Sequence, residues 1–177
     1  MGIDPGTNFT GYGIISIADK KAECISMGYI ELCKIKDTYQ KLRHIFERIS
    51  ALIDSYQPDE VAFESPFYGE NVQSMLKLGR AQGVAMAAAL TKGIPVYEYA
   101  PRKIKLSITG KGGASKEQVA SLLANILKIE VLPKNLDSTD GLAVAMCHYY
   151  QSSTVIQTGG SSSWSEFIKK NPGRVKK

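Results

Sequence analysis

The chain has 177 residues, of which 44% are hydrophobic and 22% charged, and its formal net charge is +5. This size and composition are typical of one globular domain with a sizeable buried core. They argue against a membrane protein, because no apolar run approaches the ~20 residues that cross a bilayer. Met1 leads directly into Asp4 rather than into a basic and then apolar stretch, so we also expect no secretory signal.

Most of the positive charge lies in the C-terminal segment. Residues 151–177 contain one acidic residue, Glu166, and five basic ones: Lys169, Lys170, Arg174, Lys176 and Lys177. The rest of the chain is close to neutral, so net charge alone is weak evidence for a nucleic-acid partner. Residues 158–163 are mainly Gly and Ser, which is typical of a linker. We therefore expect a folded domain over residues 1–150 and a flexible basic tail over 151–177.

The cysteine pattern indicates a reducing compartment. Cys24, Cys33 and Cys147 are odd in number and lack the spacing of a zinc site or a redox pair. We interpret them as small buried side chains rather than disulfides or metal ligands, and we expect a cytosolic protein.

The first elements read as a strand followed by an antiparallel pair. Residues 2–4 predict a strand that ends at Asp4, where Pro5 and Gly6 turn the chain. This strand is short beside the usual ~5–6 residues, so we expect either that the natural chain begins further upstream or that the strand is clipped. Two longer strands, 10–18 and 22–32, follow across a polar turn.

The middle of the chain predicts helix, strand and helix. Apolar residues at intervals of three and four predict an amphipathic helix over 39–56, with His44 on its charged, solvated side. A short buried strand, 60–64, ends at Glu64 just before Ser65 and Pro66. The next helix, 73–90, is rich in small residues and apolar nearly all round. It is either buried within the fold or packed on one face against a second copy of the chain.

The last third predicts a strand over 93–99, a short helix over 102–109 and a glycine loop over 110–113. A capping box at Ser115 opens a further helix, and a final helix spans 141–150. His148 is interpreted as a histidine in the last turn of that helix. This order favours an α/β fold, with a mixed sheet covered by helices on both faces.

Four acidic residues occur at the ends of predicted elements. Asp4 and Glu64 each end a strand, and they meet at one sheet edge if the two strands are parallel neighbours. Asp137 and Asp140 project from one side of a helix start, where an N-cap and a first-turn acid would also explain them.

Together, four acids meet only at high electrostatic cost unless a cation neutralises them. Oxygen-only ligands favour Mg²⁺ or Mn²⁺. Two such ions ~3.5–4 Å apart suit in-line attack on a phosphodiester.

The residues around these acids resemble one known family, the RuvC family of Holliday-junction resolvases. The matching stretches are Gly-Ile-Asp-Pro-Gly-Thr at 2–7, Thr-Gly-Tyr-Gly at 10–13, Phe63-Glu64 followed by Phe67, Leu-Lys-Leu-Gly-Arg-Ala-Gln-Gly-Val at 76–84, and Asp-Ser-Thr-Asp-Gly-Leu-Ala at 137–143. They come in the family's order from the start of the chain to about residue 150.

The resemblance implies a ribonuclease H-like fold with a central mixed five-stranded sheet. It also implies a homodimer that cuts two opposed strands of a four-way junction with Mg²⁺, leaving 5′-phosphate and 3′-hydroxyl ends. Mn²⁺ is the substitute ion, two ions are expected per site, and a branch-migration complex of the RuvA-RuvB type is the implied partner. The four acids match the family's catalytic and metal-binding positions: Asp4, Glu64, Asp137 and Asp140. The family's dimer helix matches 73–90, which indicates contacts at Leu76, Gly79, Gly83 and Met86.

Basic residues between 102 and 116 are candidates for contact with DNA phosphates. No acid interrupts this stretch, although scattered surface lysines would explain it equally well. The resemblance supports Lys105 and Lys116 near the cut strand. It also supports Phe67 as a base-stacking residue, although an aromatic after a strand is ordinarily part of the core. The predicted DNA-contacting set is Phe67, Arg80, Arg102, Lys103, Lys105, Lys111 and Lys116.

Two other classes remain open. Actin-like ATPases and sugar kinases also begin with an apolar strand, an Asp and a Gly-Thr turn, but they need a second such domain. A non-catalytic junction-binding module is the other alternative, and it would leave four acids in the groove unexplained.

Overall fold

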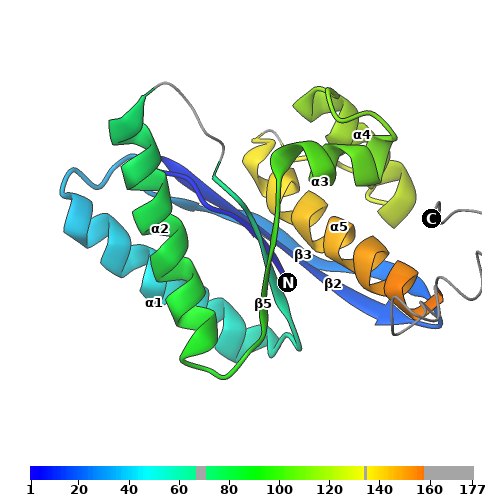
Figure 1. Ribbon diagram of the computed structural model, residues 1–177, viewed down its shortest axis with the longest axis horizontal. Coiled ribbons are helices and arrows are strands. Elements are labelled where there is room, and N and C mark those ends of the chain that lie inside the picture. The colour runs from blue at the N-terminus through cyan, green and yellow to red at the C-terminus, as the bar shows by residue number, and fades with distance from the viewer. Residues whose placement is uncertain (67–70, 134, 158–177) are drawn as a thin grey trace, which may run out of the picture.

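The computed structural model describes residues 1–66, 71–133 and 135–157. Within these ranges the chain forms five strands and five helices (Figure 1). In chain order they are β1 (Gly2–Asp4), β2 (Phe9–Ala18), β3 (Lys21–Glu31), α1 (Thr38–Tyr56), β4 (Val61–Glu64), α2 (Val72–Leu90), β5 (Val96–Tyr99), α3 (Pro101–Thr109), α4 (Lys116–Leu127) and α5 (Asp137–Gln157).

The strands form one mixed sheet in the order β3-β2-β1-β4-β5. β1 pairs antiparallel with β2 and parallel with β4, and β4 pairs parallel with β5. The helices α1 and α2 cover one face, whereas α3, α4 and α5 cover the other (Figure 1). The predicted mixed five-stranded sheet with helices on both faces is therefore confirmed.

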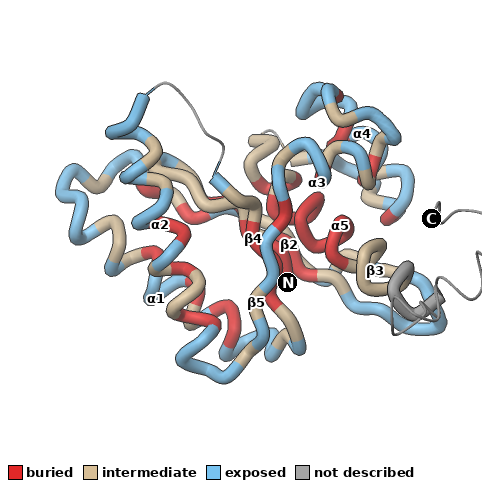
Figure 2. The backbone as a smooth tube through the Cα atoms, viewed as in Figure 1, coloured by how far each residue is buried: buried red, intermediate tan, exposed pale blue. Residues whose placement is uncertain are grey.

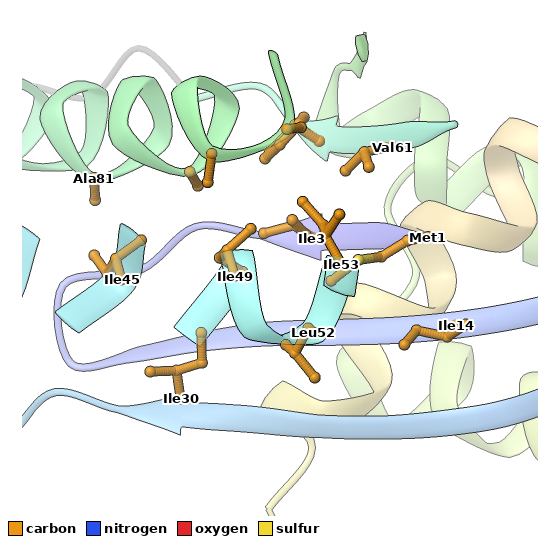
Figure 3. Packing of buried hydrophobic residues seen from close by; sticks show 14 of the residues in the cluster. Met1, Ile3, Ile14, Ile30, Ile45, Ile49, Leu52, Ile53, Val61 and Ala81 are labelled. Carbon is orange, nitrogen blue, oxygen red and sulfur yellow. The ribbon is translucent and has the colours of Figure 1, made fainter. Parts of the chain in front are cut away.

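One core lies between the sheet and the pair α1 and α2. Ile3 of β1 and Phe63 of β4 are fully buried, and Ile49 of α1 packs into the same cluster. Figure 3 shows Ile3, Ile49 and Val61 converging in this layer. The amphipathic pattern of α1 produces this packing, and the Asp37 side chain caps the helix by accepting a hydrogen bond from Gln40 N–H.

On the other sheet face, α5 lies directly against the backbone of β1 and β2. A Cβ added at Gly141 would lie 2.5 Å from Tyr12 N, and one at Gly13 would lie 2.5 Å from Leu142 N. Real Cβ atoms do not approach so closely. Glycines at Gly2, Gly11 and Gly13 in the sheet and at Gly141 in the helix are therefore required for this contact. Figure 2 shows the resulting buried band along α5.

The helix α2 buries only one face within the chain, so the alternative of a helix buried on all sides within the fold is wrong. Ala81, Ala85 and Ala88 are buried against α1 and the sheet. On the other side, Leu76 is 52% exposed, and nothing lies within 4 Å of a Cβ built at Gly79 or Gly83.

The final helix is longer at both ends than the predicted 141–150. It begins at Asp137, because the Asn135 side chain accepts a hydrogen bond from Asp137 N–H at 2.9 Å. It continues to Gln157, and Ser152 and Ser153 donate their hydroxyls to carbonyls of the preceding turn. The predicted domain boundary at residue 150 falls within this helix. Residues 158–177 lie outside the described ranges, so the flexible tail stays a prediction.

Two smaller expectations are also wrong. His148 is not in a last turn but is buried in the middle of α5, where Tyr99 and Glu60 hydrogen-bond its two ring nitrogens at 2.7 and 2.8 Å. Of the three free cysteines, Cys147 is buried, but Cys33 is exposed. No helix of the described ranges is long and apolar enough to cross a membrane.

Gly141→Ala should destabilise the fold although alanine favours helices. The added methyl meets the β2 backbone, which cannot yield as a flexible side chain would. We expect a loss of roughly 2–3 kcal/mol or more in the free energy of unfolding, seen as a melting temperature about 4–12 °C lower.

Gly113→Ala is the matched control, because nothing lies within 4 Å of a Cβ there. It should change stability by less than about 0.5 kcal/mol. Equal stability of the two variants would contradict the close contact between α5 and the sheet.

Candidate active site

Asp4 and Glu64 emerge side by side from the sheet. The parallel register places Gly2 opposite Ala62 and Ile3 opposite Phe63, so Asp4 and Glu64 come next at the same edge. The loop after Asp4 is held in place because the buried Thr10 hydroxyl bonds both the carbonyl and the N–H of Gly6, at 3.2 and 3.3 Å. The predicted meeting of two strand-end carboxylates is thus seen in the structure.

The first turn of α5 brings Asp137 and Asp140 to the same edge. Gly11 faces the Asp137 carbonyl so closely that no side chain could be accommodated there. Asn135 accepts from Asp137 N–H, so Asp137 is in the first turn and is not the N-cap. The Asp140 side chain is 14% exposed, whereas that of Asp137 is 29% exposed. The glycine contact with β2 therefore fixes where these acids stand.

Lys116, the first residue of α4, joins the two acids of α5. Its ammonium lies 2.5 Å from Asp140 Oδ2 and 3.3 Å from Asp137 Oδ1. The Ser115 capping box that the sequence predicts sets the start of this helix. A residue predicted to touch DNA is thus also the nearest cation to the acids of α5.

A hollow of about 600 Å³ opens beside these residues. Three of the acids and three of the predicted DNA-contacting residues line it: Asp4, Glu64, Asp140, Arg102, Lys105 and Lys116. Asp137 is not among the lining residues and reaches the site through Lys116. Acidic and basic side chains therefore line the same hollow, which suits a substrate whose phosphate is both bound and attacked.

Burial and mutual repulsion raise the pKa values of three of the acids: Asp4, Glu64 and Asp140. Burial, followed by the negative charge of Asp140, raises the pKa of Asp4 to about 7. Burial and the charge of Asp4 raise the pKa of Glu64 to about 8. Burial also raises the pKa of Asp140, although the hydrogen bond from Lys116 opposes it. For Lys116, burial would lower the pKa, but the hydrogen bond and charge of Asp140 outweigh it and raise it.

The donor chemistry of this cluster fits a hard divalent cation. The four acids supply only oxygen ligands, and the raised pKa values of Asp4, Glu64 and Asp140 indicate negative charge that the protein does not fully compensate. As they lie, no three acidic, His or Cys side chains of the described ranges are grouped to hold an ion. Lys116 instead compensates Asp137 and Asp140, so an ion would compete with it for Asp140.

Comparison with known proteins identifies the family. A family profile described as "Crossover junction endodeoxyribonuclease RuvC" matches residues 1–148. The chain belongs to the RuvC family. Curated RuvC proteins of Christiangramia forsetii and Bacteroides fragilis are 55% and 56% identical to it, over 99% of this chain and 92% and 95% of theirs. Membership of this family implies dependence on a divalent metal ion.

Solved RuvC structures have the same fold. That of Thermus thermophilus RuvC matches with a TM-score of 0.76 and 29% identity, over 86% of this chain and 95% of that one. The structure titled "T. thermophilus RuvC in complex with Holliday junction substrate" matches with a TM-score of 0.78 and 29% identity, over 85% and 92% of the two chains. The predicted ribonuclease H-like fold is thereby confirmed.

Three other residues predicted to contact DNA, Lys103, Lys111 and Arg80, are not among the residues that line this hollow. Lys103 stands over the Tyr99 ring, 5.1 Å from its centroid. Lys111 lines a different depression beside α4. Arg80 is exposed on α2, and Phe67 lies outside the described residues. The predictions for these four positions remain untested.

Sequence reasoning missed Gln82, a polar residue on the buried face of α2. Its Nε2 donates to the Glu64 carbonyl at 3.3 Å and to Glu98 Oε1 at 2.7 Å. Gln82 is only 7% exposed, so these bonds link α2 to the strand end that carries a candidate catalytic acid. The one available signal was a lone amide among the small residues of this helix.

The metal-free protein should lose stability as the pH rises. Asp4 and Glu64 hold protons more tightly in the folded chain than in the unfolded one. The protonated forms of these two acids therefore contribute their full stabilisation of the folded state below about pH 4, and this contribution is lost as the pH rises through about 7 to 8. At about pH 4, the melting temperature of Asp4→Asn should be close to that of the parent. At about pH 8.5 it should be higher, and the free energy of unfolding should be larger by up to roughly 4 kcal/mol.

Thermal melts in a chelating buffer measure this difference. Asp54→Asn, at an exposed acid that pairs with Lys92, is the control and should show no gain at high pH. An Asp4→Asn variant that is destabilised equally at both pH values would contradict the raised pKa values.

Proposed function

We propose that this protein resolves four-way DNA junctions in recombination and repair by nicking two opposed strands. The observation that carries the proposal is the single sheet edge at which Asp4, Glu64 and Asp140 share a hollow with Lys105 and Lys116. The protein's membership of the RuvC family supports the same activity. The products would be 5′-phosphate and 3′-hydroxyl ends.

Within this proposal, Asp4, Glu64, Asp137 and Asp140 hold divalent ions, and the expected species are two Mg²⁺, with Mn²⁺ as a substitute. When bound, such ions lower the pKa of the attacking water and stabilise the leaving 3′ oxygen. The support is an oxygen-only donor set whose raised pKa values favour displacement of its protons by a cation.

The cations around the hollow would hold the DNA backbone. Lys105, Lys116 and Arg102 line it together with three of the acids and would contact phosphates without regard to base sequence. Lys116 would change partners during the cycle, from Asp137 and Asp140 in the metal-free chain to a phosphate once ions neutralise those acids. Phe67 as a base-stacking residue remains part of the proposal.

We further propose that the exposed side of α2 forms a homodimer contact. Leu76 is 52% exposed there, and open space surrounds Gly79 and Gly83, so a second backbone could approach closely. Met86 is half-buried against the core and would lie at the margin of this contact. A dimer supplies the two active sites that paired nicks require. A branch-migration complex of the RuvA-RuvB type and a cytoplasmic location remain predictions.

Cleavage of a labelled four-way junction with Mg²⁺, beside a linear duplex of equal length, tests the activity. We expect paired symmetric nicks in the junction only. Asp4→Asn should retain junction binding but reduce cleavage by more than about 100-fold. Even residues that only hydrogen-bond to metal ligands commonly change metal affinity or activity by about 10–100-fold when mutated, and Asp4 is itself a proposed ligand. Asp54→Asn, far from the acids in sequence and paired with Lys92, should cut normally. Equal cutting of both substrates, or ATP hydrolysis without DNA cleavage, would contradict the proposal.

The dimer contact is tested by Gly83→Glu. The site is open in the single chain, so the variant should fold normally, but a charge in the proposed contact should repel the partner. Light scattering at micromolar concentration should show a dimer for the parent chain and a monomer for the variant. Gly113→Glu is the matched control, because its surroundings are also open. A dimeric Gly83→Glu, or a monomeric parent, would exclude this contact.

A further inference from the structure

A second basic hollow lies on the sheet face opposite Lys105 and Lys116. It has a volume of about 210 Å³, and Lys36, Lys41 and Lys77 line it together with Gly6 and Thr7. Lys41 comes from α1 and Lys77 from α2, so three separate segments bring cations to one place. We call it the three-lysine hollow.

The loop that forms the floor of the three-lysine hollow is tied down at several points. Lys41 Nζ donates a hydrogen bond to the Thr7 carbonyl at 2.9 Å. Leu32 N–H donates to the Asn8 carbonyl at 2.8 Å, and the Thr10 hydroxyl donates to Gly6. A fixed loop and a partly fixed ammonium form a preorganised surface, whereas lysines on a solvated face are free to turn away.

Carboxylates of the described ranges do not pair with the lysines of this hollow. In the described part of the chain, none of Lys36, Lys41 and Lys77 forms an ion pair. The nearby carboxylate of Asp37 is engaged as the N-cap of α1. By contrast, Lys34 pairs with Glu31 and Lys92 with Asp54. The hollow is therefore a site of concentrated positive charge that suits an anion.

The loop after Asp4 links the catalytic edge to the three-lysine hollow. Asp4 lines the acidic hollow, and with Pro5 and Leu78 it also lines a small depression on the side of α2. Gly6, the next residue, lines the three-lysine hollow, and Lys77 precedes Leu78. A path along Asp4, Pro5 and Gly6 thus leads from one basic region to the other across the sheet edge.

We propose that Lys36, Lys41 and Lys77 bind backbone phosphates of the junction strand that passes over Asp4. The strand would then be held on both faces of the sheet edge, by Lys105 and Lys116 on one side and by the three-lysine hollow on the other. This inference rests on the proposed junction-cutting function and adds to it a second phosphate site. Because the lysines do not touch the acids, they act on binding and not on the bond-breaking step.

Salt dependence of junction binding tests this site. The double variant Lys36→Gln/Lys77→Gln leaves the contact of Lys41 with the Thr7 carbonyl intact. The triple variant adds Lys41→Gln. Dissociation constants for a labelled junction are measured over a series of salt concentrations in metal-free buffer. We expect the slope of log affinity against log salt to become shallower by about 1–2, since each neutralised phosphate contributes about 0.9. Affinity should fall on the order of tenfold at physiological salt.

Lys34→Gln is the matched control, because its ammonium lies close in sequence but pairs with Glu31. Its slope should equal that of the parent. Lys41→Arg should retain binding, since it keeps the charge. In the double variant, half-maximal cleavage should require more protein in proportion to the loss of junction affinity, as expected for a loss of binding.

Slopes and affinities of the double and triple variants that equal those of Lys34→Gln would overturn the inference. A second result would also overturn it. If inorganic phosphate at constant ionic strength raises the melting temperature of the parent but not of the lysine variants, while junction binding is unaltered, the ligand of the hollow is a free phosphate. A parent protein that cuts no junction would instead refute the proposed function, so the two failures are distinguishable.

Discussion

The arrangement depends on the contact of α5 with the backbone of β1 and β2. Glycine at Gly2, Gly11, Gly13 and Gly141 leaves out Cβ atoms that would hold helix and sheet apart. Since Asp137 and Asp140 lie in the first turn of α5, the contact sets their distance from Asp4 on the sheet. The acids are thus positioned by packed regular elements, which is how a site that must hold its ligands within a fraction of an ångström is best supported.

This positioning has an electrostatic cost, which the same contact makes unavoidable. Half-buried acids that face one another resist ionisation, and the pKa values of Asp4, Glu64 and Asp140 are all raised. The ammonium of Lys116 contacts and partly neutralises the two acids of α5. Asp4 and Glu64 are half-buried and repel each other, and within the described ranges they form no such ion pair. A cation would relieve that repulsion, so stability is given up in the metal-free state for a site ready to bind metal.

The sequence predicted the elements well where local signals decide them. Pro66 and Glu64 mark the end of β4, and the spacing of apolar residues marks α1. The start of α5 was misplaced because Asp137 resembles an N-cap, whereas Asn135 supplies the capping oxygen. The contacts of Lys116 with Asp140, of Gln82 with Glu64 and of His148 with Glu60 join residues far apart in the chain. No periodicity or spacing contains such pairings, which arise only once helices are packed on the sheet.

Asp4, Glu64 and Asp140 form one proton-binding cluster, and we expect a divalent ion to displace its protons. Calorimetric titration of Mg²⁺ into the protein near pH 7, in two buffers of different ionisation enthalpy, measures the protons released on binding. We expect release on the order of one proton per site, because Asp4 and Glu64 are still partly protonated there. Asp140→Asn should weaken binding and reduce this release. Binding that releases no protons and is unchanged in Asp140→Asn would show that these acids do not form one metal-binding cluster.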